Sequence, residues 1–374
     1  MPSAPVKTPM TTSATSSVAS SVATTKARDP WFDNAKMALV TLVVIGHAWT
    51  LLPPNTTDNW LYDFLYAWHV PAFVLITGYL SKSFTWEPRR LRALVTTVAV
   101  PYVLFEGALA LFRLRVGHEH LNDLWADPHW PMWYLSALFF WRLMTPIFKR
   151  IPAPVVVAVA ISLVAGLRAG DTFDFARVFG LLPFFVVGLS LHRGHLELLR
   201  RPRARAIAVG VLATIFVLAR FTDTWIATEW LYYRSTYGDL RTSDMQAATI
   251  RMVLLLVGLA GALAFLSLVP RRASWFTALG SATLVVYLWH GFFVLGAGYS
   301  GFPEWATAHP VLSLVVTTAV AAGLAIGLAS PPAARMLNHA VDPIGSLTRR
   351  LVQPAPAPEP VRELVSAGSS SDVS

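Results

Sequence analysis

The stretch KMALVTLVVIGH, residues 36–47, is the most informative part of this sequence. An ionisable residue stands at each end, Lys36 and His47, and none lies between them. Because eleven residues make about three turns of an α-helix, the two side chains share one helical face and lie roughly 16 Å apart along the axis. A histidine inside an apolar segment of membrane length costs free energy and so marks a candidate functional site. The stretch therefore predicts a membrane helix with chemistry near its far end.

The composition is typical of a membrane protein. Of the 374 residues, 55% are hydrophobic and 14% are charged, whereas soluble proteins carry about 25% charged residues. The mean hydropathy is +0.52. The net charge of +9 is spread through short loops between apolar runs, which favours orientation in a membrane over nucleic-acid binding. The absence of cysteine excludes disulfides, thiolate metal sites and a cysteine nucleophile.

The apolar runs predict an all-α, polytopic membrane bundle of about ten transmembrane helices. Ten runs are long enough, or nearly so, to cross the roughly 30 Å hydrocarbon core. They lie near residues 36–52, 60–80, 91–112, 131–148, 151–168, 176–192, 205–221, 247–269, 274–297 and 311–330. Polar, low-complexity flanks at 1–29 and 336–374 are expected to be largely disordered, leaving a membrane domain at 30–335.

The loops between the runs alternate in charge. With the N-terminus inside, the cytoplasmic loops hold thirteen lysines and arginines against two acids, Glu87 and Glu197, whereas the opposite loops hold most of the acidic residues. Loops on the cytoplasmic side of a membrane carry an excess of Lys and Arg. Both termini are therefore predicted to be cytoplasmic, in a multi-pass protein of the cell membrane.

Four ionisable residues on four different runs lie at a similar depth. They are His47, His69, Glu106 and His290. At 1.5 Å per residue they fall roughly 7–13 Å below the predicted outer surface. Isolated ionisable groups that face lipid cost a few kcal/mol each. We therefore expect the four side chains to face one shared polar cavity.

His47 and Lys36 each have two interpretations. His47 is either a buried histidine satisfied by a neighbouring carbonyl or hydroxyl, or a general base, because imidazole takes up and returns a proton near neutral pH. Lys36 either anchors its helix at the inner interface or binds a donor molecule there. Asp33, one helical turn earlier, is a candidate ion-pair partner for this lysine or a solvated acid at a helix start.

The remaining candidates also have structural alternatives. Pro71, two residues after His69, predicts a helix break that frees the carbonyls at 67 and 68, although kinks without function are common. His290 is a site residue or part of an aromatic belt, and Glu106 is a histidine partner or an isolated protonated acid. Three arginines at the inner end of the third run either anchor it or bind a phosphorylated donor; they are Arg89, Arg90 and Arg92.

One outer loop, HEHLNDLWADPHW at residues 118–130, invites a metal interpretation. It contains three histidines, His118, His120 and His129. Their spacing matches no strong zinc signature, so we expect a solvated loop at an acceptor entrance and no bound metal. The sequence also contains no P-loop, nucleophile elbow or dinucleotide fingerprint.

Several segments together resemble the membrane acyltransferase family 3. WFDNAKMALVTLVVIGHAW (31–49) contains a basic residue, ten residues and a histidine, as the first helix of that family does, and WHVPAFVLITGYL (68–80) is similar to its second-helix phrase. Four further segments match later elements in order: RRLRALVTTVAVPY (89–102), PMWYLSALFFWRL (131–143), LLPFFVVGLSL (181–191) and VVYLWHGFF (285–293). The start and the compact size are most similar to the fucose 4-O-acetylase-like branch.

The resemblance implies an integral membrane O-acyltransferase. The activity it implies is transfer of an acyl group, usually acetyl from acetyl-CoA, to a hydroxyl of a sugar or another cell-envelope or secreted acceptor, with His47 as the catalytic histidine. The implied partners are acyl-CoA, the acceptor and the lipid bilayer, without nucleic acid. Because no hydrolase-like domain follows the last run, we expect transfer to be completed within the bundle or with a partner. A proton-coupled transporter is the alternative, since intramembrane histidines, a glutamate and a kinked helix suit it as well.

Overall fold

A computed structural model of the chain describes residues 29–121, 128, 130–170 and 172–346. Within these residues every regular element is a helix, which confirms the all-α prediction. The segments 1–28 and 347–374 lie outside the described residues, and so does His129. The predicted flanks are therefore mostly beyond what the structure describes.

Each apolar run coincides with one α-helix or with a broken series of α- and π-helices, and a few shorter α-helices lie between or after the runs. In chain order they are α1 (Pro30–Trp49), α2 (Thr56–Tyr66), α3 (His69–Leu80), α4 (Pro88–Leu94), the π-helical η1 (Val95–Ala99), α5 (Val100–Arg115), α6 (Trp133–Phe148), α7 (Pro154–Arg168), α8 (Phe175–Gly180), α9 (Leu182–Ser190), α10 (Arg193–Leu198), α11 (Pro202–Ala219), α12 (Asp244–Leu268), α13 (Trp275–Leu279), α14 (Thr283–Gly298), α15 (Phe302–Ala308), α16 (Pro310–Ala329) and α17 (Pro331–Val341).

Fewer helices than predicted are long enough to be membrane spans by length and composition. Among the described residues four helices qualify, or six if each of two bent pairs is taken as one span. Part of the shortfall arises because α6 and α7 have 16 and 15 residues and the second run is divided into α2 and α3, of 11 and 12 residues, whereas a span needs about 20 residues. Helix α1 has 20 residues but does not meet the combined test of hydropathy and charge. The structure is thus a bundle rich in apolar helices, and the count of ten stays a prediction.

Proline marks the start of many helices. Its fixed φ suits the first helical position. A backbone N–H at that position has no acceptor within the helix, so proline loses no hydrogen bond there. The helices that begin with proline are α1, α4, α7, α11, α16 and α17. The last of these extends the helical part into the predicted C-terminal flank, because α17 packs against α14 and α16 and buries Val341.

The second apolar run is broken near Pro71, as predicted. The break separates α2 from α3, and the imidazole Nδ1 of His69 bonds to the carbonyl of Leu65 at 2.8 Å. The carbonyl of Trp68 accepts the backbone N–H of Ala72 at 2.9 Å, so this carbonyl, which we expected to be free, is occupied.

The third run contains the π-helical turn η1. Pro101 carries no N–H and cannot bond to the carbonyl of Thr97 four residues earlier, so the regular ladder is interrupted there. Single π-turns within helices often lie at functional sites. In this chain Thr97 and Val98 line the larger cavity described below.

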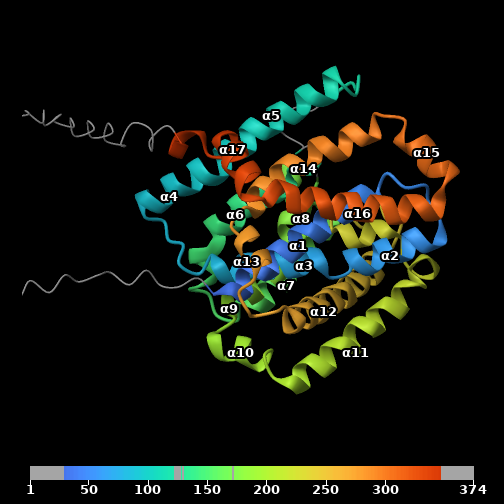
Figure 1. The fold of residues 1–374 in the computed structure, drawn as a ribbon. Coiled ribbons are helices and arrows are strands. Elements are labelled where there is room, and N and C mark those ends of the chain that lie inside the picture. Colours follow the sequence, from blue (N-terminus) through green and yellow to red (C-terminus); the bar gives the residue numbers. More distant parts are fainter. Residues whose placement is uncertain (1–28, 122–127, 129, 171, 347–374) are drawn as a thin grey trace, which may run out of the picture.

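Helix α1 lies in the middle of the bundle, whereas α5 and α11 lie at opposite edges (Figure 1). It packs against α2, α3, α13, α14 and α16. Close backbone contact also joins α3 to α9, because a Cβ at Gly78 would lie 2.0 Å from the carbonyl oxygen of Phe185. A Cβ at Gly188 would lie 2.1 Å from that of Leu75. Small residues allow such close packing in membrane bundles.

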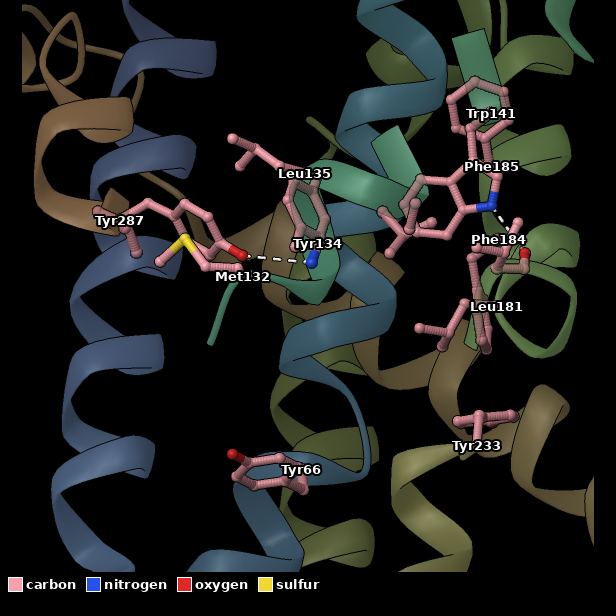
Figure 2. Close-up of a cluster of buried hydrophobic side chains, with 14 of the residues drawn as sticks. Tyr66, Met132, Tyr134, Leu135, Trp141, Leu181, Phe184, Phe185, Tyr233 and Tyr287 are labelled. Atoms are coloured by element: carbon pink, nitrogen blue, oxygen red, sulfur yellow. Dashed lines mark hydrogen bonds between the residues drawn. The ribbon is translucent and has the colours of Figure 1, made fainter. Parts of the chain in front are cut away.

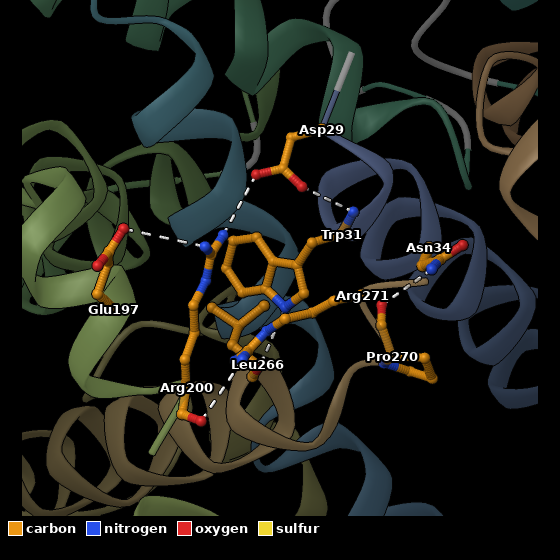
Figure 3. A network of polar contacts seen from close by, with 8 residues as sticks. All are labelled: Asp29, Trp31, Asn34, Glu197, Arg200, Leu266, Pro270 and Arg271. Atoms are coloured by element: carbon orange, nitrogen blue, oxygen red, sulfur yellow. Dashed lines mark hydrogen bonds and ion pairs between the residues drawn. The ribbon is translucent and has the colours of Figure 1, made fainter. Parts of the chain in front are cut away.

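A polar network fixes the start of α1 at one end of the bundle (Figure 3). The Trp31 indole N–H donates to the carbonyl of Leu266 at 3.2 Å, and an Asn34 amide N–H donates to that of Pro270 at 2.9 Å. Arg200 pairs with Asp29 at 3.3 Å. The start of α1, the segment around Arg200 and the segment that follows α12 therefore meet at one end of the bundle. The charge pattern assigns all three to the same side of the membrane, and Arg200 has a structural role there.

Candidate active site

A cavity of about 310 Å³ lies between α1, α3, η1, α6 and α14, and we call it the lysine cavity. Lys36 and Arg142 lie on its wall, together with five hydroxyl-bearing residues, Thr77, Thr97, Tyr134, Thr283 and Tyr287. The rest of the lining is mainly aliphatic. The cavity reaches the surface at Leu80 and Thr97, which are exposed.

A much smaller cavity, the histidine pocket, adjoins the lysine cavity. Its volume is about 30 Å³, enough for a water molecule or a small reacting group. It is lined by Val43, His47, His69, Val70, Phe73, Trp133, Tyr134 and Tyr287. Three of these residues, Phe73, Tyr134 and Tyr287, also line the lysine cavity, so these side chains form the boundary between the two spaces.

The boundary side chains are held in place by hydrogen bonds. The backbone N–H of Tyr134 donates to the hydroxyl of Tyr287 at 3.2 Å, a contact drawn between the facing helices in Figure 2. The Tyr287 hydroxyl in turn donates to the carbonyl of Pro131, and the Tyr134 hydroxyl is bonded to that of Thr77. Two tyrosines with fixed hydroxyls therefore stand where the cavities meet.

His47 and His290 form a buried pair at the histidine pocket. The Nδ1 of His47 lies 2.9 Å from the Nε2 of His290. The two rings are stacked at 22°, and the indole of Trp130 packs 4.4 Å from the His47 ring, measured between centroids. The exposed fractions are 6% for His47 and 0% for His290. Residues 243 positions apart in the chain are thus brought into direct contact.

The hydrogen bonds select one tautomer for each ring when both are neutral. The Nδ1 of His290 lies 2.6 Å from the carbonyl of Tyr287, and a carbonyl only accepts, so this nitrogen carries the proton. The Nε2 of His290 is then an acceptor, and the Nδ1 of His47 must donate to it. This leaves the Nε2 of His47 without a proton, which is the state that a general base needs.

His69 supplies a second ring to the same pocket. Because its Nδ1 donates to the Leu65 carbonyl at 2.8 Å, its Nε2 is an acceptor in the neutral ring. The Tyr66 ring packs edge-on against His69, with centroids 4.8 Å apart. The pocket thus has two imidazoles, His47 and His69, each fixed by a bond at Nδ1.

Arg177 on α8 is a cation that the sequence analysis did not single out. Its guanidinium pairs with Asp174, donates to the carbonyl of Tyr232 at 3.2 Å and lies 5.0 Å from the ring of Trp133, which lines the histidine pocket. It also acts electrostatically on His47. A positive charge shared with Asp174 therefore lies against Trp133 in the wall of the histidine pocket, and no motif in the segment pointed to it.

The other predicted site residues lie at different distances from the cavities. Lys36 pairs with Asp33 at 2.8 Å, which confirms the ion-pair alternative, and it also lines the lysine cavity. Glu106 is buried on α5 and acts electrostatically on Tyr287 behind the cavity wall. The prediction of one shared cavity thus holds for His47 and His69. His290 reaches the pocket only through its contact with His47, and both His290 and Glu106 are outside the linings of the two cavities described here.

The three arginines of the third run lie on α4, which leads directly into the cavity-lining turn η1. Arg89 and Arg92 are exposed, and Arg90 lies 3.6 Å from Glu87. Arg142, on α6, is instead the arginine that lines the lysine cavity. Within the described residues, no group of three or more His, Asp or Glu side chains is arranged to hold a metal ion.

Comparison with known proteins gives one family and two partial relatives. A family model described as an acyltransferase domain matches residues 29–329. The nodulation protein NolL of Mesorhizobium japonicum is 30% identical over 155 residues, and NolL of Sinorhizobium fredii is 31% identical over 135 residues. These matches cover 37% and 32% of this chain, and 42% and 37% of the two relatives. No solved structure gives a significant match.

The family match includes every helix that lines the two cavities. It begins at the N-cap of α1 and ends with α16, so it contains Lys36, His47, His69 and His290. It extends over most of the chain, whereas the NolL matches extend over about a third of it. The chain belongs to the acyltransferase family 3.

Proposed function

We propose that this protein is an integral membrane O-acyltransferase of the cell membrane. It moves an acyl group, acetyl from acetyl-CoA in the simplest case, to a hydroxyl of a sugar or another cell-envelope or secreted acceptor. The observation that carries the proposal is the position of His47, which is bonded through Nδ1 to His290 and lines a pocket that shares three wall residues with the lysine cavity. A donor that enters beside Lys36 would reach this base by passing the boundary residues Phe73, Tyr134 and Tyr287.

In the reaction, the acceptor hydroxyl attacks the thioester carbonyl of the donor. His47 Nε2 takes the hydroxyl proton, a C–O bond forms, the C–S bond breaks, and the imidazolium returns the proton to the CoA thiolate. A variant route transfers the acyl group first to His47 as an acyl-imidazole and then to the acceptor. In both routes His290 holds the His47 ring, and His69 or Arg177 contacts the acceptor.

The arrangement in the membrane follows from the charge pattern. We place the acyltransferase domain at 30–335, about ten spans across the bilayer and both termini in the cytoplasm, with flanks at 1–29 and 336–374. The end of the bundle that contains Lys36 then faces the cytoplasm, where acyl-CoA is made. On α4, Arg89, Arg90 and Arg92 attract the anionic donor to the mouth of the cavity. Membership of an acyltransferase family favours this enzyme over the proton-coupled transporter.

Membranes or purified protein with labelled acetyl-CoA test the proposal. Transfer of label to a hydroxyl acceptor in the wild type and its loss in His47→Ala, with the variant still inserted in the membrane, is the expected result. His309→Ala is the matched control, because His309 is an exposed histidine at the junction of α15 and α16. Wild-type transfer by His47→Ala would reject the role of His47.

A further inference from the structure

Arg142 is a cation inside the apolar part of the bundle that faces a cavity. It lies on α6 eight residues after Tyr134, about 12 Å further along the helix axis. Both residues line the lysine cavity, and Lys36 on α1 lines it as well. Arg142 therefore stands towards the lysine end of the cavity, away from the histidine pocket.

The guanidinium of Arg142 has no counter-ion in the part of the chain that the structure describes. Its electrostatic neighbour there is the hydroxyl of Tyr134, and no carboxylate or carbonyl is bonded to it. Arg142 is half-buried on the wall of the lysine cavity, and a cation in such a mainly apolar setting costs free energy unless it is paired or hydrogen-bonded. An arginine that lines a cavity without such partners is therefore arranged for an anion that comes from outside the chain.

Other enclosed arginines of the bundle differ from Arg142 in this respect. Arg251 donates to the carbonyl of Ser162 at 3.2 Å and lies 5.0 Å from the ring of Tyr237. Arg177 pairs with Asp174 and stacks over Trp133. The fold thus satisfies these two guanidinium groups internally, whereas the donors of Arg142 are left for a ligand.

We propose that Arg142, together with Lys36, binds a phosphate group of the acyl donor. This inference rests on the proposed function for the identity of the ligand. Lys36 shares its charge with Asp33, so Arg142 supplies the positive charge that is not already neutralised. The planar guanidinium also suits phosphate oxygens, which it can bind through two parallel hydrogen bonds.

The distance from Lys36 to His47 and the lining of the cavity both fit the elongated shape of acyl-CoA. Lys36 lies roughly 16 Å from His47 along α1, and the wall between them is mainly apolar, with Leu39, Ile76, Leu135 and Leu138 among its residues. In acyl-CoA a long uncharged pantetheine arm separates the thioester from the phosphates. The phosphates would therefore meet Arg142 and Lys36 while the thioester passes Tyr134 and Tyr287 to His47.

Ligand binding by the full-length protein in lipid nanodiscs tests the inference. The probes are CoA and 4′-phosphopantetheine, which carry phosphate, and pantetheine, which does not. We expect Arg142→Gln to raise the dissociation constants of CoA and 4′-phosphopantetheine roughly 10- to 100-fold and to leave that of pantetheine unchanged. Arg142→Lys should weaken binding less, because it keeps the charge and loses only the two-pronged geometry. Arg150→Gln, in the exposed turn that follows α6, is the control and should bind like the wild type.

Four results would overturn the inference. Equal weakening of pantetheine and CoA by Arg142→Gln would show that the substitution deforms the cavity. Unchanged CoA binding by a folded Arg142→Gln protein would remove Arg142 from the donor site, while leaving the proposed function intact. The phosphate that Arg142 binds could come from the acyl donor or from a lipid headgroup, and nanodiscs with and without phosphatidylglycerol distinguish the two. If Arg142→Gln weakened retention of phosphatidylglycerol and left CoA binding unchanged, the site would belong to a lipid headgroup. If the wild type binds none of the three probes, the acyl-CoA donor of the proposed function fails as well.

Discussion

The lysine cavity and the histidine pocket share three wall residues but are built for different tasks. The lysine cavity is about ten times larger, 310 Å³ against 30 Å³, and has apolar walls with two cations. The histidine pocket has room for little more than the reacting atoms and contains two imidazoles whose tautomers are fixed by neighbours. The difference separates binding from chemistry: substitutions in the larger space should change the donor KM, and those in the smaller one kcat.

Replacement of His47 by alanine should have the largest effect. It removes the base, and general-base catalysis contributes roughly 10²- to 10⁴-fold to rate, so kcat for acyl transfer should fall at least that far. The donor dissociation constant should stay near the wild-type value, since His47 lines the histidine pocket and not the lysine cavity. If His47→Ala kept the wild-type kcat and weakened donor binding, the histidine pocket would be the donor-binding space and not the site of the chemical step.

Replacement of His290 by alanine should have the next largest effect. His47 Nδ1 would lose its acceptor at 2.9 Å, and its ring would no longer be held in one tautomer. We expect kcat to fall roughly 10- to 100-fold, less than when the base itself is lost. Steady-state kinetics with a saturating donor measures this. If His290→Ala and His47→Ala were equally inactive, His290 would be part of the reacting machinery and not only a positioning residue.

Replacement of Lys36 should change donor binding and leave the chemical step intact. Lys36→Gln should raise the donor KM about tenfold at an unchanged kcat, the size expected for one charge-assisted hydrogen bond. Because Lys36→Gln leaves Asp33 without its partner, the double variant Lys36→Gln/Asp33→Asn is needed as a control. A normal KM in the double variant would show that Lys36 acts only by neutralising Asp33.

The exposed arginines of α4 should have the smallest effect. Arg89 and Arg92 lie outside the cavity lining, so they can act on the donor only through long-range attraction. The double variant Arg89→Gln/Arg92→Gln should raise the donor KM a few-fold at low salt, and the difference should shrink as ionic strength rises. An increase in the donor KM that does not depend on salt would instead indicate that these arginines contact the donor directly.

The positions of the helices could be predicted from the sequence, because they depend on local patterns. Apolar runs located the helices, Pro71 located the break before α3, and the ion pair between Lys36 and Asp33 followed from their spacing. The number of spans did not follow as directly, since several runs form helices shorter than the bilayer or broken pairs.

The contacts of the site could not be predicted, because they depend on which helices pack together. His47 and His290 meet only because α1 packs against α14, and nothing within either segment specifies that pairing. Arg142 lies six residues before the end of α6, where an arginine is usually an interface anchor that snorkels. Its place on the wall of the lysine cavity depends on how α6 packs against the other helices that line the cavity.

A structure of the His47→Ala protein with acetyl-CoA bound tests the central claim most directly. The account predicts that the phosphates lie beside Lys36 and Arg142, and that the thioester carbonyl passes Phe73, Tyr134 and Tyr287 to stand next to position 47. An acetyl-CoA molecule bound elsewhere, or one whose thioester remains on the lysine side of these three residues, would contradict it.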